Sequence, residues 1–383
     1  MKQKSIEKTF VLVKILQEIG PAWTFSTYVL FLIGNSLSLF EVSMLNLVYM
    51  SISTLLDPFT GNLGDRIGQK KVYLSGLFFW GLGMLVYGFS KSFGFFVLAE
   101  GIAAVGNALM SEALESWLRN HCNEGRSHKA LSNASYRAKL ATIPTAIAGG
   151  LVGAKWGLNV TWLLAGLTSF FALGVAWYLL RKYSDERKAT DPSNLNLWLI
   201  SKTAWKEPTL RRSFIVVALI TAAVQPFNMF WSVIFKEASG NSAWLGFLWM
   251  GIAIMSALGS FLAKKWTISS KGLATIVIAI GLPMILPLIS GNWILFMLIP
   301  FLIHEIGRST WIPVLFSYTN RKIENKVRTS VNSLRSSAGT FGAAIGLLVS
   351  GTLTKWLSPV EVWAVSAITL LILALWIRGW NHD

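Results

Sequence analysis

The sequence predicts an all-α polytopic membrane protein with twelve membrane-spanning helices, arranged as two bundles of six. Of its 383 residues, 53% are hydrophobic and only 14% are charged, whereas a soluble domain carries about 25% charged residues. Apolar runs of about 20 residues recur from end to end, and each can cross a hydrocarbon core about 30 Å thick. Backbone polar groups must be satisfied internally in such a core, so these runs predict helices. A long polar interval divides the runs into six and six.

The twelve spans follow one another along the chain. We place them at residues 9–33, 41–60, 70–90, 93–117, 133–154, 158–181, 211–235, 243–263, 272–290, 293–318, 329–353 and 358–378. The first run is long and lacks a small-residue cleavage site, which indicates a retained span and not a signal peptide. The polar interval contains the run Tyr183-Ser-Asp-Glu-Arg-Lys-Ala-Thr-Asp-Pro-Ser, which is typical of a solvated linker. We therefore expect an N-terminal bundle at 1–181, a cytoplasmic linker at 182–210 and a C-terminal bundle at 211–383.

The basic residues are distributed unevenly across the expected membrane. If the N-terminus is inside, most of the 34 Lys and Arg lie in cytoplasmic segments, and the external loops hold only Lys91, Lys155, Lys236 and Lys355. This asymmetry predicts a multi-pass protein of a bacterial inner membrane with both termini in the cytoplasm. The net charge of +16 is then a topology signal, which predicts contact with the anionic inner leaflet and no nucleic-acid partner.

The turn between the second and third spans carries the most informative motif. It reads Gly61-Asn-Leu-Gly64-Asp65-Arg66-Ile-Gly68-Gln-Lys70-Lys71. The three glycines allow helix ends to approach closely and to turn sharply. We expect Asp65 near the start of the following helix, where a carboxylate suits the positive end of the helix dipole. The turn resembles the cytoplasmic signature of the major facilitator superfamily.

The resemblance implies a two-bundle transporter that works by alternating access. It extends to the end of span two (Asp57-Pro58 to Gly61), to span four and to the start of span eleven (Arg328 to Ser333). Within the superfamily the sequence is most like bacterial drug:proton antiporters. It departs from them in span four, where Glu100 replaces a common Arg and only Gly106 of the nearby motif remains.

The resemblance also implies a gate at the cytoplasmic end of the bundles. This charge network would hold the halves together while the cavity faces outward, and it would break when the cavity opens inward. The gating residues expected from the motif and its charged neighbours are Gly61, Gly64, Asp65, Arg66, Gly68, Lys70, Asp57, Glu112, Glu115, Arg328 and Arg335.

Ionisable residues inside spans are costly and indicate function or mutual pairing. Lys14 and Glu18 lie four residues apart and Glu305 and Arg308 three apart, so each pair shares a helix face, and a structural ion pair explains them as well as a functional site does. Glu100 has no basic neighbour within a helical turn. The candidates for proton coupling are Glu100, Glu18, Glu305 and Arg308. For Glu100 the alternatives are pairing to a base on another span, or capping of the span near the external surface.

Aromatic and amide residues in the middle of several spans are candidates for a substrate cavity. They are Trp23, Tyr28, Gln225, Phe227, Asn228, Trp231 and Trp311. Such a lining would suit a lipophilic or cationic molecule. Contact with lipid is the competing explanation for any one of these aromatic residues.

Several function classes lack their motifs. The chain has no GxxxxGK[ST] phosphate loop, HExxH or CxxC pair, and its single cysteine is Cys122, so we expect no enzyme, no cofactor and no metal site. We expect a monomeric carrier of a small molecule, coupled to protons, that exports lipophilic compounds or drugs. Uptake or exchange of a sugar, organic ion or other metabolite is the alternative within transport, and a membrane sensor or assembly partner is the alternative outside it.

Overall fold

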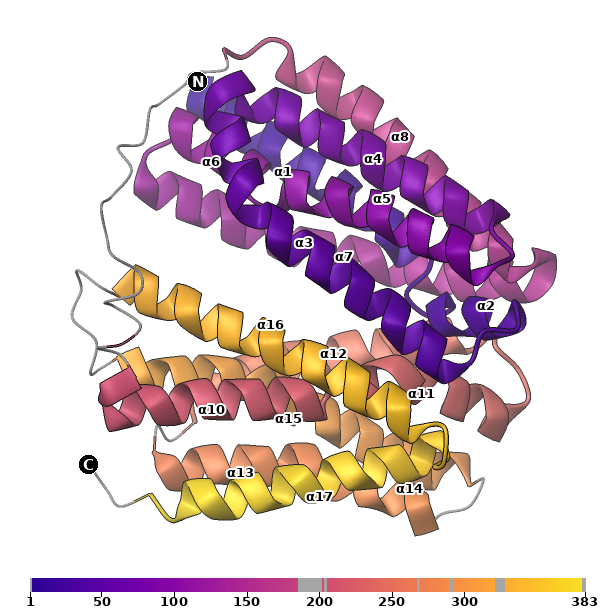
Figure 1. The fold of residues 1–383 in the computed structure, drawn as a ribbon. Helices are drawn as coiled ribbons and strands as arrows, with labels where there is room; N and C mark the ends of the chain where they lie inside the picture. The colour runs from indigo at the N-terminus through magenta and orange to yellow at the C-terminus, as the bar shows by residue number, and fades with distance from the viewer. Residues whose placement is uncertain are drawn as a thin grey trace. The chain divides into compact units, whose positions relative to one another are not determined.

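The computed structural model describes residues 2–184, 202, 205–266, 269–289, 293–320 and 328–380 (Figure 1). These ranges are mostly helical, and no strand occurs in them. The helices are α1 (Lys2–Ala22), α2 (Tyr28–Gly34), α3 (Leu39–Ile67), α4 (Gln69–Phe89), α5 (Phe93–Ser111), α6 (Ala113–His121), α7 (Glu124–Trp156), α8 (Leu158–Leu180), α10 (Pro208–Ala223), α11 (Gln225–Ser239), α12 (Leu245–Ala263), α13 (Ser270–Gly281), η1 (Leu282–Ile285), α14 (Leu286–Ile289), α15 (Ile294–Asn320), α16 (Arg328–Leu353) and α17 (Pro359–Arg378). Most of the predicted linker lies outside the described residues.

Every predicted span coincides with one helix or with two or three consecutive ones, so the predicted fold class is confirmed. Nine segments among the described residues are long and apolar enough to cross a membrane by composition alone. The other three expected spans, at 9–33, 133–154 and 293–318, fall on α1 with α2, on α7 and on α15. Span four is divided at Glu112, where α5 ends and α6 begins, and span seven is divided just before Pro226.

The chain forms two compact units. The first unit comprises Met1–Pro192 with Asn241–Met250, and the second comprises Ser193–Gly240 with Gly251–Asp383. In the first unit α4 packs against α5 and α8, and α1 packs against α7 and α8 (Figure 1). In the second unit α10 packs against α16, and α13 packs against α17 and α15.

Small residues bring α4 and α5 into close contact in the first unit. A Cβ atom on Gly106 would lie 2.4 Å from the backbone nitrogen of Trp80 and 2.8 Å from the carbonyl oxygen of Gly76. Distances this short leave no room for a methyl group, so glycine is required at this crossing. Such close backbone approach is a usual means of packing helices in membranes.

The signature turn differs from the prediction in one respect. Helix α3 continues through Asp65 and Arg66 to Ile67, and only Gly68, with φ of 100°, separates it from α4. Asp65 therefore lies in the last turn of α3 and not at the start of the next helix. The expected interaction with a positive dipole end was wrong, because the glycines at 61 and 64 remain helical. Arg66, by contrast, suits the negative end of α3.

Candidate functional site

Glu100 lies in a polar cluster within the first unit. Its side chain is buried, and its Oε1 accepts hydrogen bonds from the hydroxyls of Tyr87 (2.6 Å) and Tyr28 (2.9 Å). The Tyr28 hydroxyl in turn accepts a 2.6 Å hydrogen bond from Nδ2 of Asn46. Residues from α2, α3, α4 and α5 thus converge on one carboxylate. The described residues give it two hydroxyl donors and no basic partner.

Aromatic rings surround this carboxylate. The ring of Tyr87 stacks on Trp162 with centroids 4.0 Å apart, and Tyr28 contacts the same indole at 5.6 Å. Phe31 and Phe96 extend the cluster at 5.5 Å from Trp162 and 5.3 Å from Tyr87 respectively. A carboxylate held by hydroxyls and enclosed by rings can accept a proton or attract a cation.

A second polar cluster lies in the second unit. Nη1 of Arg308 donates a 2.6 Å hydrogen bond to Oε1 of Glu305, and Nη2 donates a 2.6 Å hydrogen bond to Oδ1 of Asn228. The ion pair between Glu305 and Arg308, predicted from their spacing, is present. The adjacent His304 is fully buried, and its Nδ1 lies 2.7 Å from the carbonyl oxygen of Ile280. Since a carbonyl only accepts, Nδ1 is the protonated nitrogen of that ring.

The predicted pair on the first span also forms. Nζ of Lys14 lies 3.0 Å from Oε1 of Glu18, and both side chains are partly exposed. Mutual pairing accounts for both charges, so Glu18 has a weaker geometric case for proton coupling than Glu100.

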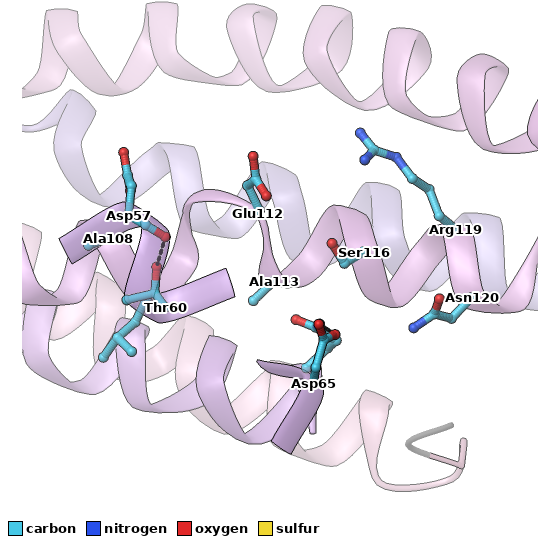
Figure 2. A pocket seen from close by; sticks show the side chains of 11 residues that line it. Asp57, Thr60, Asp65, Ala108, Glu112, Ala113, Ser116, Arg119 and Asn120 are labelled. Atoms are coloured by element: carbon cyan, nitrogen blue, oxygen red, sulfur yellow. Dashed lines mark hydrogen bonds between the residues drawn. The ribbon is translucent and has the colours of Figure 1, made fainter. Parts of the chain in front are cut away.

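Acidic residues gather around a cavity at the end of α3, α5 and α6. The cavity has a volume of about 300 Å³. Its lining residues are Asp57, Thr60, Asp65, Gln69, Ala108, Leu109, Glu112, Ala113, Ser116, Arg119 and Asn120 (Figure 2). Figure 2 shows the side chains of Asp57, Glu112 and Arg119 extending to the same side. The structure thus brings Asp57, Asp65 and Glu112 of the predicted gate together.

Hydrogen bonds from two polar side chains hold parts of this acidic cluster. The Ser111 hydroxyl donates to Oδ1 of Asp57 at 3.2 Å, and Nε2 of Gln69 donates to Oδ1 of Asp65 at 3.2 Å. Glu115 pairs with Arg119 at 3.2 Å, one turn along α6. The sequence prediction missed Ser111 and Gln69, and no helical spacing relates Gln69 to Asp65 because Gly68 separates their helices.

The remaining gating candidates occupy several environments. Nζ of Lys70 donates a 2.5 Å hydrogen bond to the carbonyl oxygen of Tyr183, at the end of the first unit. Arg66 is exposed, and the side chain of Arg328 lies outside the described residues. Arg335 is fully buried over the ring of Phe316 at 4.4 Å, and its three guanidinium nitrogens have no hydrogen-bond partner among the described residues.

Three of the seven predicted cavity residues are buried, and the other four are partly exposed. Phe227, Trp231 and Trp311 are buried, and Phe227 packs edge-on against His304 with centroids 4.5 Å apart. Nε1 of Trp23 donates to the Thr168 hydroxyl at 3.0 Å, and Nε2 of Gln225 donates to its own helix at Thr221. Only Tyr28 and Asn228 belong to the two polar clusters.

The sequence prediction missed Tyr87 and Asn46. Both are polar residues inside apolar spans, a signal that could have found them, but their meeting at Glu100 depends on helix packing. In the part of the chain that the structure describes, no group of three or more His, Cys, Asp or Glu residues is placed to hold a metal ion.

Comparisons with known proteins agree with this architecture. The sequence profile described as "Major Facilitator Superfamily" matches residues 12–334. The "Putative niacin/nicotinamide transporter NiaP" of Bacillus subtilis (strain 168) is 22% identical over 329 residues, which cover 82% of this chain and 79% of that protein.

Two solved structures share the fold. The nucleoside transporter NupG has a TM-score of 0.80 at 13% identity, with 98% of this chain and 100% of that chain covered. A bacterial homolog of the human lysosomal transporter Spinster, in an inward-facing and occupied conformation, has a TM-score of 0.77 at 14% identity, with 97% and 95% covered. At identities this low the two structures show a common fold only, and the substrate has to be argued from the side chains of this chain.

Proposed function

Because the chain belongs to the major facilitator superfamily, we propose that this secondary transporter couples the movement of a small organic solute to protons, with Glu100 as the proton carrier. Its transport cycle is alternating access between two six-helix bundles, at 1–181 and 211–383, joined by the linker at 182–210. Both termini lie in the cytoplasm, and the protein works as a monomer.

The geometry of Glu100 is the observation that supports proton coupling. A carboxylate in a membrane span is costly while it is charged, and it is commonly retained for a functional reason. Two hydroxyl donors, Tyr28 and Tyr87, stabilise the charged form. Because hydroxyls also accept hydrogen bonds, the same pair can stay bonded to the protonated acid. Glu100 can therefore exist in both forms without an unsatisfied partner.

Gating belongs to the acidic cluster around the cavity at the end of α3, α5 and α6. Asp65 and Glu112 supply negative charge there, Asp57 lies beside Ser111, and Glu115 pairs with the lining residue Arg119. Arg66, Lys70, Arg328 and Arg335 are the cationic members that we assign to the gate, with Gly61, Gly64 and Gly68 shaping its turn.

We favour uptake or exchange of a metabolite over export of a drug. A relative that this chain matches over 79% of that protein's length is named as a putative niacin and nicotinamide transporter, which favours a metabolite as the substrate. Export of lipophilic cations is a second candidate, because rings of Tyr28, Tyr87 and Trp162 flank the buried Glu100 carboxylate. Such an aromatic and acidic site would attract a cation.

The test is solute-driven proton movement in proteoliposomes loaded with a pH-sensitive dye. Niacin, nicotinamide, a nucleoside and the lipophilic cation ethidium are imposed as gradients in turn. We expect an organic solute to drive proton flux with the native protein, and Glu100→Gln to abolish that flux while solute exchange continues. Undiminished proton flux with Glu100→Gln would remove Glu100 from the mechanism. Flux with ethidium alone would establish the second candidate.

A further inference from the structure

Arg308 is a charged residue near the middle of a membrane-spanning helix. It is the fifteenth of the 27 residues of α15, so it lies near the bilayer midplane, where transporters of this architecture bind their substrates. On a helix that turns about 100° per residue, Ile299 and Ile303 fall on the face opposite to Arg308. Both isoleucines are exposed, which marks their side of α15 as the lipid face. Arg308 therefore faces away from lipid.

Two neighbours fix the direction of the Arg308 guanidinium. Glu305 accepts from Nη1 and Asn228 accepts from Nη2, each at 2.6 Å. These acceptors come from different helices, α15 and α11, so the planar group is held at two points. A guanidinium has five N–H donors. Two are used here, and the other three have no partner among the described residues.

The exposure of the cluster is uneven. Glu305 is 3% exposed, whereas the Arg308 side chain is 25% exposed. The carboxylate thus lies behind the guanidinium, and the unused donors belong to the more accessible member of the pair. If the ion pair were purely structural, we would expect both charges to be buried, and the pair would not need the side-chain amide of Asn228. Ile312, one turn further along the same face, is also exposed and offers apolar surface beside the guanidinium.

We propose that Arg308 binds the carboxylate of a small organic anion, with Glu305 and Asn228 as positioning residues. The rigid fork of a guanidinium matches a carboxylate by two parallel hydrogen bonds, a geometry that lysine cannot reproduce. The exposed apolar surface at Ile312 suits the body of such a molecule. This site deepens the proposed function, since it names the substrate class of the same transporter.

The charge balance links this site to the proton carrier. An anion that enters alone would add a negative charge to the membrane interior, which is costly. If Glu100 takes up one proton in the same cycle, the charge of the anion is compensated. The expected process is therefore one-to-one symport of a proton and a monocarboxylate, with no net charge moved. The one-to-one stoichiometry rests on the proposed proton coupling. The binding of the anion at Arg308 does not depend on it.

The test uses pairs of ligands that differ only in charge. Binding of nicotinate and nicotinamide, and of benzoate and benzamide, is measured by calorimetry on the purified full-length protein. We expect each carboxylate to bind at least about tenfold more tightly than its amide, a difference of about 1.4 kcal/mol. Equal affinities within both pairs, or no binding of either carboxylate, would overturn the proposal.

Variants of Arg308 and Asn228 test whether the guanidinium fork is what binds the carboxylate. Arg308→Lys keeps the positive charge but removes the fork, so we expect carboxylate binding to weaken at least about tenfold, and Arg378→Lys is the matched control on α17. Unchanged carboxylate binding in Arg308→Lys would count against the site. Asn228→Ala removes only the uncharged hydrogen-bond acceptor of Arg308, so it should weaken carboxylate binding less than Arg308→Lys does. Should Arg308→Lys fail to fold, Asn228→Ala together with the native ligand pairs still decides the question.

Glu100→Gln distinguishes a failure of this inference from a failure of the proposed function. We expect that variant to bind nicotinate normally and to lose proton flux. Normal proton flux together with fork-dependent binding would leave the anion site standing and remove Glu100 as the carrier.

Discussion

The Tyr87 hydroxyl donates a 2.6 Å hydrogen bond to Glu100, from the helix that precedes α5 in the chain. Tyr87 is fully buried and also stacks on Trp162, so the ring position is fixed independently of the carboxylate. The donor is therefore preorganised, and the acid can change its protonation state without moving a helix. This relationship makes Tyr87 a positioning residue for the proposed proton carrier.

Tyr87→Phe should destabilise the protein and disturb proton coupling together. The change keeps the ring but removes one hydrogen bond to a buried carboxylate, an interaction worth about 2 kcal/mol. We expect a lower midpoint of thermal unfolding in detergent and a slower solute-driven proton flux. Tyr136→Phe is the control, because Tyr136 is 65% exposed. A Tyr87→Phe protein that matches the native one in both measurements would contradict this role.

Asp65→Asn should slow transport and leave solute binding largely intact. Asp65 lines the acidic cavity and accepts from Gln69 across the α3–α4 turn, far along α3 from Asn46, which bonds to Tyr28 in the Glu100 cluster. Removing its charge weakens the proposed gate, so we expect a transport rate about tenfold lower, which corresponds to about 1.4 kcal/mol in the barrier. Transport rate and calorimetric affinity are measured on the same preparation. A selective loss of affinity with normal turnover would assign Asp65 to the substrate site.

Much of the fold could be predicted from the sequence because hydrophobic length reports directly on membrane crossing. The twelve predicted spans all coincide with helices, and the pairs Lys14–Glu18 and Glu305–Arg308 followed from helical spacing. The turn at Gly61–Lys71 was only partly predicted, since composition does not reveal which of three glycines leaves the helix. Backbone geometry assigns that role to Gly68 alone.

The candidate site was less accessible to sequence reasoning. Glu100 is a candidate because it lacks a basic neighbour along its own helix, but its hydrogen-bond partners lie on two other helices, α2 and α4. Helix packing brings Tyr28, Asn46 and Tyr87 to Glu100, and no spacing rule relates positions so far apart in the chain. The amide support of Arg308 by Asn228 is hidden for the same reason.

Gly106→Ala should disrupt the packing of α4 against α5. The added methyl carbon would lie 2.4 Å from the backbone of Trp80, and a backbone contact cannot be relieved by a rotamer change. Overpacking of this kind costs about 1–3 kcal/mol. We expect a lower thermal unfolding midpoint for Gly106→Ala but not for Gly94→Ala, since a Cβ on Gly94 would meet nothing within 4 Å. Equal midpoints for the two variants would show that the crossing is looser than the structure has it.

The proposed orientation can be tested with the single native cysteine as a starting point. Burial raises the pKa of the Cys122 thiol, and nearby Glu7 adds to this effect while Arg126 opposes it. The reactive thiolate is therefore scarce at pH 7, and labelling of native Cys122 by a maleimide should be slow and should accelerate as the pH rises. The Cys122→Ser substitution removes this slow background labelling altogether.

In the Cys122→Ser protein, new cysteines at exposed positions report which side of the membrane they face. We expect Lys91→Cys to react with a membrane-impermeant maleimide in intact cells, and Lys129→Cys to react only after the membrane is permeabilised, since both side chains are exposed. Lys91 lies in an expected external loop and Lys129 in an expected cytoplasmic segment, so the difference reads out orientation and not burial. Permeabilised cells, in which both variants should label, provide the control for reactivity. The reverse pattern in intact cells would place both termini outside and would overturn the assignment of the acidic cavity to the cytoplasmic side.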